Sequence, residues 1–310
     1  MDHQHVPGPG GTPPGPSPVP SPFLPDEPAA VASASEPAAV PPAEPPAVAS
    51  VDESAAVPPA DEPPVVASAG ELSEVVLPAE LAEAARTLFG DRLDLAAAYA
   101  ELLGTDGVVR GLIGPREAPR IWDRHLLNCA AVAERIPQGA TVIDVGSGAG
   151  LPGLVLAIAR PDLEVTLVEP LARRTSFLVE AVQQLGLTRS VRVFRGRADE
   201  AASGATGVGP FSGDVVTARA VAPLDRLAAW CLPLAVRGGR VIALKGASAS
   251  EEIAEHGAAV ARAGGGEPVV HRCGTGIIDP PTTVVEIVRE RMVVPRAAKP
   301  SRAARRGRGR

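Results

Sequence analysis

The chain has few cysteines, no long apolar run and no hydrophobic leader, and each shortage excludes a class of protein. Cys129, Cys231 and Cys273 are the three cysteines among 310 residues, and none belongs to a Cys-x-x-Cys pair. A disulfide framework or a cysteine-rich metal site is not expected, which fits a reducing compartment. The sequence also lacks both an apolar run of about 18 residues and an N-terminal basic stretch leading into an apolar one. We expect a cytoplasmic protein without a membrane partner.

The two ends of the chain differ from its middle in composition and charge. Residues 1–75 hold 19 of the 34 prolines and 11 acidic side chains but no lysine or arginine, which predicts a disordered Pro/Ala-rich acidic tail. Residues 295–310 carry seven basic side chains and no acid, which predicts a disordered basic tail that either solubilises the protein or binds nucleic acid. The formal charge of -6 therefore leaves about -2 for the middle, which does not exclude an RNA partner.

The middle of the chain divides into a helical region, residues 76–138, and a region of alternating strands and helices, residues 139–294. Apolar residues at helical spacing predict amphipathic helices in the first region. Short apolar runs predict strands in the second at 141–145, 164–169, 191–195, 214–218, 240–245 and 283–289. Helical patterns between them lie at 151–159, 172–185, 223–234 and 249–263. This alternation predicts an α/β domain with a mostly parallel sheet and helices on both faces.

A glycine-rich loop, "GSGAG", follows the first predicted strand. Ligands of such sheets bind at the carboxyl ends of the strands, and glycines there let the backbone approach them closely. Gly148, Gly150 and Gly153 match the dinucleotide template G-x-G-x-x-G. Gly146, Gly148 and Gly150 match G-x-G-x-G after an acidic strand end, the pattern of S-adenosylmethionine methyltransferases. A purely structural turn is a third interpretation, so the loop alone does not decide.

The ends of the later strands favour S-adenosylmethionine. Glu169 closes the second strand, 19 residues after Gly150, where a carboxylate can accept both ribose hydroxyls. Asp199 lies in the loop predicted after the third strand and can meet the exocyclic amine of adenine. Arg219 and Lys245 end the fourth and fifth strands. S-adenosylmethionine has no pyrophosphate, so it does not need Gly153, the glycine that the dinucleotide template places at the start of the helix.

Several motifs together resemble one family. "RHLLNCAAV", "VIDVGSGAGLPGLVLAIARPDLEVTLVE", "RRTSFL", "GRADE", "TARAVAPL" and "ALKG", within about Arg116–Glu290, are similar to the ribosomal RNA small subunit methyltransferase G family, also called GidB. The resemblance implies a Rossmann-like class I methyltransferase with a seven-stranded sheet. It also implies methyl transfer from S-adenosylmethionine to N7 of a guanosine in the 530 loop of 16S rRNA (position 527 in common rRNA numbering). By the same resemblance, the cofactor contacts are Gly146, Leu151, Ala198, Asp199 and Arg219.

The chemistry of guanine N7 bears on which side chains the reaction needs. Its lone pair is free, so no general base is obligatory, and alignment of the two reactants can supply most of the acceleration. We therefore predict no obligatory catalytic residue. Arg219 and Lys245 are candidates for orienting guanine O6. Arg124 and His125, on the helix before the first strand, are candidates at the mouth of the pocket, although His125 fits a packed or capping role equally well.

Other features leave alternatives open. Trp122 fits the core better than a stack on a flipped base, and Arg173 or Arg174 contacts phosphate or is simply solvated. "DPPT", residues 279–282, looks like the clamp of exocyclic-amine methyltransferases, but it precedes the last strand and is interpreted as a loop. The expected partner is 16S rRNA or a 30S assembly intermediate, with no obligatory protein partner. An NAD-dependent oxidoreductase and a non-catalytic RNA-binding assembly factor remain the alternative functions.

Overall fold

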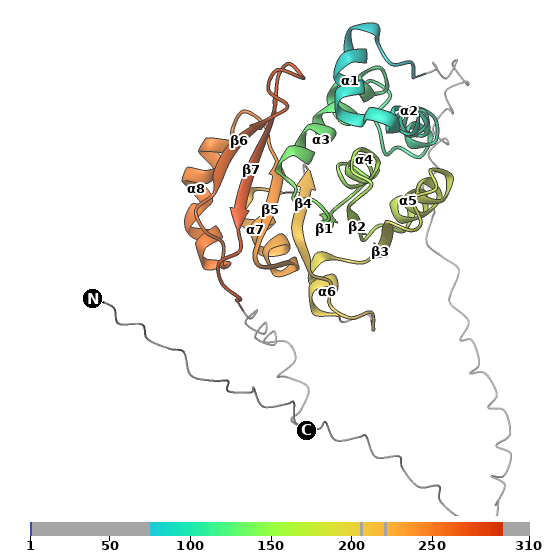
Figure 1. Ribbon diagram of the computed structural model, residues 1–310. Coiled ribbons are helices and arrows are strands. Elements are labelled where there is room, and N and C mark those ends of the chain that lie inside the picture. Colours follow the sequence, from blue (N-terminus) through green and yellow to red (C-terminus); the bar gives the residue numbers. More distant parts are fainter. Residues whose placement is uncertain (2–74, 205–206, 220–221, 294–310) are drawn as a thin grey trace, which may run out of the picture. The chain divides into compact units, whose positions relative to one another are not determined.

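The computed structural model describes Met1 and residues 75–204, 207–219 and 222–293 (Figure 1). The two predicted tails lie outside these residues, apart from Met1 and Val75. Among the described helices, none is both long enough and apolar enough to cross a membrane.

A seven-stranded sheet forms the centre of the fold, as predicted. Its strands are β1 (Thr141–Val145), β2 (Glu164–Glu169), β3 (Val191–Arg195), β4 (Gly213–Arg219), β5 (Ala235–Leu244), β6 (Val269–Cys273) and β7 (Thr282–Val288). They lie in the order β3-β2-β1-β4-β5-β7-β6. The first five strands are parallel, while β7 runs antiparallel to both β5 and β6. The sheet is therefore mostly parallel.

The strand order reverses between β1 and β4, and this reversal positions the site. The chain moves outward from β1 to β2 and β3, then returns to pair β4 with the other side of β1, where Val145 lies opposite Ala218. The glycine-rich loop after Val145 and the side chain of Arg219 consequently leave the same edge of the sheet side by side. Such a switch point is where open α/β sheets bind ligands.

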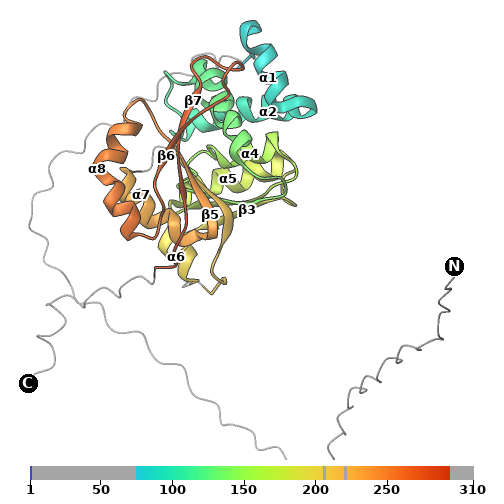
Figure 2. The ribbon, with the colours of Figure 1, turned by 60° about the vertical axis from the view of Figure 1, so that its left-hand side comes forward.

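Helices cover both faces of the sheet, again as predicted (Figures 1 and 2). One apolar cluster packs a sheet face against α1 (Ala82–Phe89), α2 (Leu93–Leu102), α3 (Asn128–Ala130), α4 (Gly153–Ala159) and α5 (Ala172–Gln184). A second cluster packs the opposite face against α6 (Ala198–Ser203), α7 (Leu224–Cys231) and α8 (Ala249–Arg262). The helices before the sheet thus share a core with α4 and α5, beside the glycine-rich loop.

Two elements differ from those that the sequence predicted. The strand β6 was not among the predicted strands, because Arg272 is exposed and His271 is polar, which interrupts the apolar run that marks a buried strand. A short helix, α6, also replaces the loop predicted around Asp199. The side chain of Glu200 caps its N-terminus by accepting a hydrogen bond from the Arg197 amide at 2.7 Å.

The helical region before the sheet is stabilised by an aromatic contact within it and by an ion pair to the sheet. Trp122 is buried and meets Phe89 edge to face, with ring centroids 6.4 Å apart, so it belongs to the core as predicted. Arg135 lies 3.0 Å from Glu286 of β7, which Arg240 of β5 also contacts. The ion pair between Arg135 and Glu286 thus joins the helical region to the sheet.

Candidate functional site

Backbone hydrogen bonds define the shape of the loop after β1. The Gly146 amide donates to the Val168 carbonyl at 2.8 Å, and the Gly150 amide donates to the Ser147 carbonyl at 2.7 Å. Gly146 and Gly148 have φ angles of 70° and 59°, which side-chain-bearing residues rarely adopt. The two glycines therefore allow a tight turn at the switch point of the sheet.

Asp144, the acidic residue near the end of the first strand, stabilises this loop through hydrogen bonds inside the protein. Its carboxylate is fully buried and accepts hydrogen bonds from the Gly153 amide at 3.1 Å and from the Thr217 hydroxyl at 2.9 Å. Burial raises the pKa of Asp144 to about 6, although these hydrogen bonds oppose the shift. Asp144 therefore joins β1 and β4 to the start of α4 and does not face a ligand.

A cavity of about 550 Å³ opens above the glycine-rich loop. Seven of the eight residues predicted to contact the cofactor line it: Gly146, Gly148, Leu151, Glu169, Ala198, Asp199 and Arg219. Gly150 is not among its lining residues. A Cβ on Gly150 would lie 2.6 Å from Leu154 and 2.8 Å from the Tyr99 hydroxyl, so this glycine permits close packing against the protein instead.

Glu169 combines a structural contact with a place on the cavity wall. One carboxylate oxygen accepts from the Gly148 amide at 3.0 Å, and the other accepts from the Leu171 amide at the same distance. Arg174, whose guanidinium lies 3.9 Å from Glu169, also lines the cavity, whereas Arg173 is not among its lining residues. Each carboxylate oxygen keeps a second lone pair for a hydroxyl donor.

Asp199 lies at the rim of the same cavity. Its side chain is 68% exposed and pairs with Arg197 at 3.1 Å, at the start of α6. The prediction that Asp199 lies in a loop was wrong, but its expected place beside the cavity is found.

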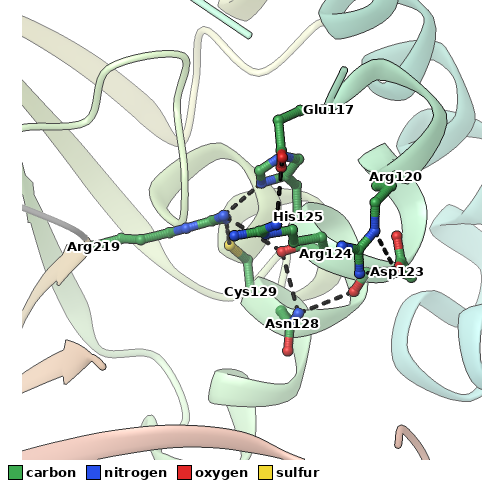
Figure 3. A network of polar contacts seen from close by, with 8 residues as sticks. All are labelled: Glu117, Arg120, Asp123, Arg124, His125, Asn128, Cys129 and Arg219. Atoms are coloured by element: carbon green, nitrogen blue, oxygen red, sulfur yellow. Dashed lines mark hydrogen bonds and ion pairs between the residues drawn. The ribbon is translucent and has the colours of Figure 1, made fainter. Parts of the chain in front are cut away.

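Arg219 forms a network with the helical region before the sheet (Figure 3). Its guanidinium donates to Nδ1 of His125, to the Cys129 sulfur at 3.2 Å and to the Arg124 carbonyl at 3.4 Å. Glu117 approaches Nε2 of His125 at 3.3 Å without forming a hydrogen bond, and it also pairs with Arg124 at 3.3 Å. None of the three groups that accept from Arg219 carries a negative charge when the Cys129 thiol is protonated.

The protonation states of this network follow from burial. Desolvation, reinforced by the positive charge of Arg219, lowers the pKa of His125 to about 4. His125 is therefore neutral at pH 7, with Nδ1 as an acceptor and the proton on Nε2. Burial also raises the pKa of the Cys129 thiol, which keeps it protonated. His125 lines the cavity from the helical side, so it is both a packed histidine and a wall of the site.

The other two positioning candidates, Lys245 and Arg124, do not line this cavity. They line a second cavity, to which Arg219 also contributes. The Lys245 ammonium is already engaged, since it lies 2.6 Å from Glu252 and donates to the Ala222 carbonyl at 2.9 Å. Residues 279–281 of "DPPT" form a loop as predicted, whereas Thr282 is the first residue of β7 and lines this second cavity.

Among the apolar residues of the first cavity that sequence reasoning missed, three lie away from the strand ends. Leu112 and Ile113 reach it from the segment after α2, and Trp230 reaches it from α7. None of them lies at a strand end, where ligand contacts were sought. Their positions depend on how the helical region and α7 pack around the loop, and no local sequence signal reports that packing.

Comparison with known proteins gives a consistent match over this region. The family model described as GidB, rRNA small subunit methyltransferase G, matches residues 92–278, more than half of the chain. A "Ribosomal RNA small subunit methyltransferase G" of Salinispora tropica is 76% identical over 233 residues, which cover 75% of this chain and 96% of the relative. Proteins of the same name from Corynebacterium efficiens and Streptomyces coelicolor are 57% and 51% identical. These matches cover 69% and 77% of this chain and 91% and 98% of the relatives.

Solved structures show a more partial likeness. The mitomycin 7-O-methyltransferase MmcR matches with a TM-score of 0.45 and 20% identity, over 68% of this chain and 66% of that chain.

Proposed function

Because the chain belongs to the ribosomal RNA small subunit methyltransferase G family, we propose that it transfers a methyl group from S-adenosylmethionine to a guanosine of 16S rRNA. The proposed acceptor is N7 of a guanosine in the 530 loop. The observation that supports this most is the first cavity, which lies at the switch point and is lined by seven residues that the motifs had assigned to the cofactor. The reaction would take place in the cytoplasm, on 16S rRNA or a 30S assembly intermediate, without an obligatory protein partner.

The residues of the first cavity fit S-adenosylmethionine. A Cβ on Gly148 would meet nothing closer than the Gly146 carbonyl at 3.8 Å, so the space in front of this glycine is open to a ligand. Glu169, buried on the cavity wall, can accept hydrogen bonds from the ribose hydroxyls, and Asp199 at the rim can accept one from the adenine amine. When bound, this cofactor supplies an electrophilic methyl group on a sulfonium centre.

The chain's own residues would act by binding and orienting. N7 of guanine needs no deprotonation, and no nucleophile or base is required of the protein. The apolar side chains of Leu112 and Ile113 exclude water from one side of the cavity. Arg219, held in place by His125 and Cys129, stands at the boundary between the two cavities and can orient O6 of the purine. Alignment is the main contribution that this arrangement offers.

The test is a methyl-transfer assay with the full chain. Radiolabelled S-adenosylmethionine is incubated with the protein and with 30S subunits from cells that lack the 530-loop modification, and in parallel with protein-free 16S rRNA. We expect label in one guanosine of the 530 loop, at a position that becomes labile to borohydride and aniline, as N7-methylguanosine does. Label elsewhere, or its absence, would overturn the proposal. Calorimetry with NADH and with S-adenosylmethionine tests the oxidoreductase alternative. That alternative requires that the protein bind NADH and not bind S-adenosylmethionine.

A further inference from the structure

A second cavity of about 610 Å³ lies on the other side of Arg219 from the first. It is bounded by the ends of β4 and β5, by the loop after β5, and by the "DPPT" turn that precedes β7. Its volume falls within the range typical of small-molecule sites, roughly 300–1,000 Å³. Because Arg219 lines both cavities, a group held in the second one is adjacent to the cofactor position proposed for the first.

The charge on the walls of the two cavities differs. The first carries the carboxylates of Glu169 and Asp199 as well as basic groups. The second is lined by four basic side chains, Arg124, Arg219, Lys245 and Arg272. No acidic side chain of the described residues lines it. A cavity lined by one sign of charge attracts the opposite sign. The second cavity is therefore suited to an anion.

Two of these four cations already have carboxylate partners. Lys245 lies 2.6 Å from Glu252, and Arg124 lies 3.3 Å from Glu117. Arg272 is exposed on β6, and its guanidinium forms no ion pair with a carboxylate that the structure describes. Arg219 likewise pairs only with neutral groups within the described part of the chain. Arg219 and Arg272, which have no carboxylate partner in the described part of the chain, are therefore the two side chains available to bind an anion in this cavity.

Asn128, which also lines the second cavity, has its amide group engaged within the protein. Asn128 donates to the carbonyls of Asp123 and Arg124, while its own oxygen accepts from the Thr282 hydroxyl at 2.6 Å. This amide is satisfied and ties the start of β7 to the helix that carries Arg124. Asn128 thus holds the cavity open between the two elements and is not available to read a base.

We propose that the second cavity receives the nucleotide to be methylated, with Arg272 binding a phosphate of its strand and Arg219 facing the base. The proposal rests on the proposed function, because it assigns a place to that reaction's substrate. A single-stranded or flipped-out nucleotide supplies a phosphate anion beside a planar base. In this placement Arg272 holds the backbone and has no contact with the cofactor.

The first test reverses the charge of Arg272. Arg272→Glu is expected to lower kcat/KM for 30S subunits or 16S rRNA at least tenfold, mainly through KM, and to leave the Kd for S-adenosylmethionine within twofold. Arg272→Ala should reduce the salt dependence of RNA binding by about one phosphate contact. Arg262→Glu is the matched control, because Arg262 is exposed on α8 and lines neither cavity. Equal kcat/KM in the Arg272→Glu and Arg262→Glu variants would overturn the proposal.

The second test fills the cavity. Gly246 lines the second cavity and a Cβ there meets no atom within 4 Å, so Gly246→Phe introduces a ring at the cavity wall without a clash at Cβ. We expect methyl transfer to RNA to fall at least tenfold, with S-adenosylmethionine affinity retained. Gly209→Phe, at an exposed glycine with equally open surroundings, is expected to behave as the wild type. Full activity of Gly246→Phe would overturn the proposal. If the wild type itself methylates no 16S rRNA, the proposed function fails instead, so the two failures are distinguishable.

Discussion

The hydroxyl of Tyr99 donates a hydrogen bond to the carbonyl of Ala149 at 2.6 Å, and so links α2 to the glycine-rich loop. Tyr99 is fully buried, and 50 residues separate the two partners along the chain. A Cβ on Gly150 would approach the same hydroxyl at 2.8 Å. The helical region before the sheet therefore packs beside the glycine-rich loop and also helps to set its shape.

Removing this hydroxyl tests whether the helical region orders the loop. In Tyr99→Phe the buried Ala149 carbonyl loses its side-chain donor, which should lower the free energy of unfolding by about 1–2 kcal/mol. We expect S-adenosylmethionine to bind roughly three- to tenfold more weakly, by calorimetry, because the loop is less well ordered. Thr87→Ala removes an exposed hydroxyl bonded to the Glu83 carbonyl on α1 and is the control. Unchanged cofactor affinity in Tyr99→Phe would show that the loop orders itself.

A second prediction separates backbone strain from blockage of the cavity. Gly148→Val places a branched side chain at a φ of 59° and into the open space of the first cavity, so cofactor binding should be lost. Gly139→Val has the same kind of strain, with a φ of 67° and nothing within 4 Å of its Cβ, but Gly139 does not line that cavity. Both variants should lose about 1–2 kcal/mol of stability. If Gly139→Val loses cofactor affinity as well, strain alone explains the effect.

The main features of the fold, and several residues that line the first cavity, could be predicted from the sequence because they depend on local patterns. Buried parallel strands are nearly continuous apolar runs, as in Thr141–Val145, and their ends point to the ligand edge. The edge strand β6 could not be found this way. Its residue Arg272 is exposed, and the strand pairs on one side only, with β7.

The parts of the site that escaped prediction depend on contacts distant in sequence. Tyr99 and Ile113 meet the first cavity or its loop only because the helical region packs beside α4. Gly150 was assigned to the cofactor by its place in a motif, yet a Cβ on this residue would point toward Leu154 and Tyr99. A motif shows which residues surround a turn, but the direction that each residue faces is set by tertiary packing.

The buried imidazole of His125 predicts a specific dependence of stability on pH. Its pKa is lowered to about 4 in the folded chain, against an ordinary value of 6.5. As the pH falls from 6.5 toward 4, the unfolded chain takes up a proton that the folded chain does not, so stability is lost over this range. At pH 5 the loss from this one group should be about 2 kcal/mol relative to pH 7.5.

His125→Gln should remove that dependence, since its amide oxygen can still accept from Arg219 but does not titrate. Urea unfolding of wild type and variant at pH 5 and pH 7.5 isolates the histidine, because other titrating groups, including Asp144 with its pKa of about 6, are common to both proteins. Parallel stability profiles for the two proteins would mean that the pKa of His125 is not lowered in the folded chain, so that the imidazole beside Arg219 would be charged at pH 5.

The last prediction concerns Glu169, which binds the loop through its contact with the Gly148 amide and faces the cavity at the same time. Glu169→Ala should weaken S-adenosylmethionine binding by more than tenfold, because it removes the acceptor for the ribose hydroxyls and one contact that holds the loop. Glu169→Gln keeps one acceptor oxygen and should lose less. Glu164→Ala, at the exposed beginning of the same strand, is the matched control and should bind as the wild type does. Because Glu169 does not line the second cavity, the Kd for RNA should stay unchanged in both alanine variants. A loss of RNA affinity together with cofactor affinity in Glu169→Ala would show that the two cavities are coupled through the loop.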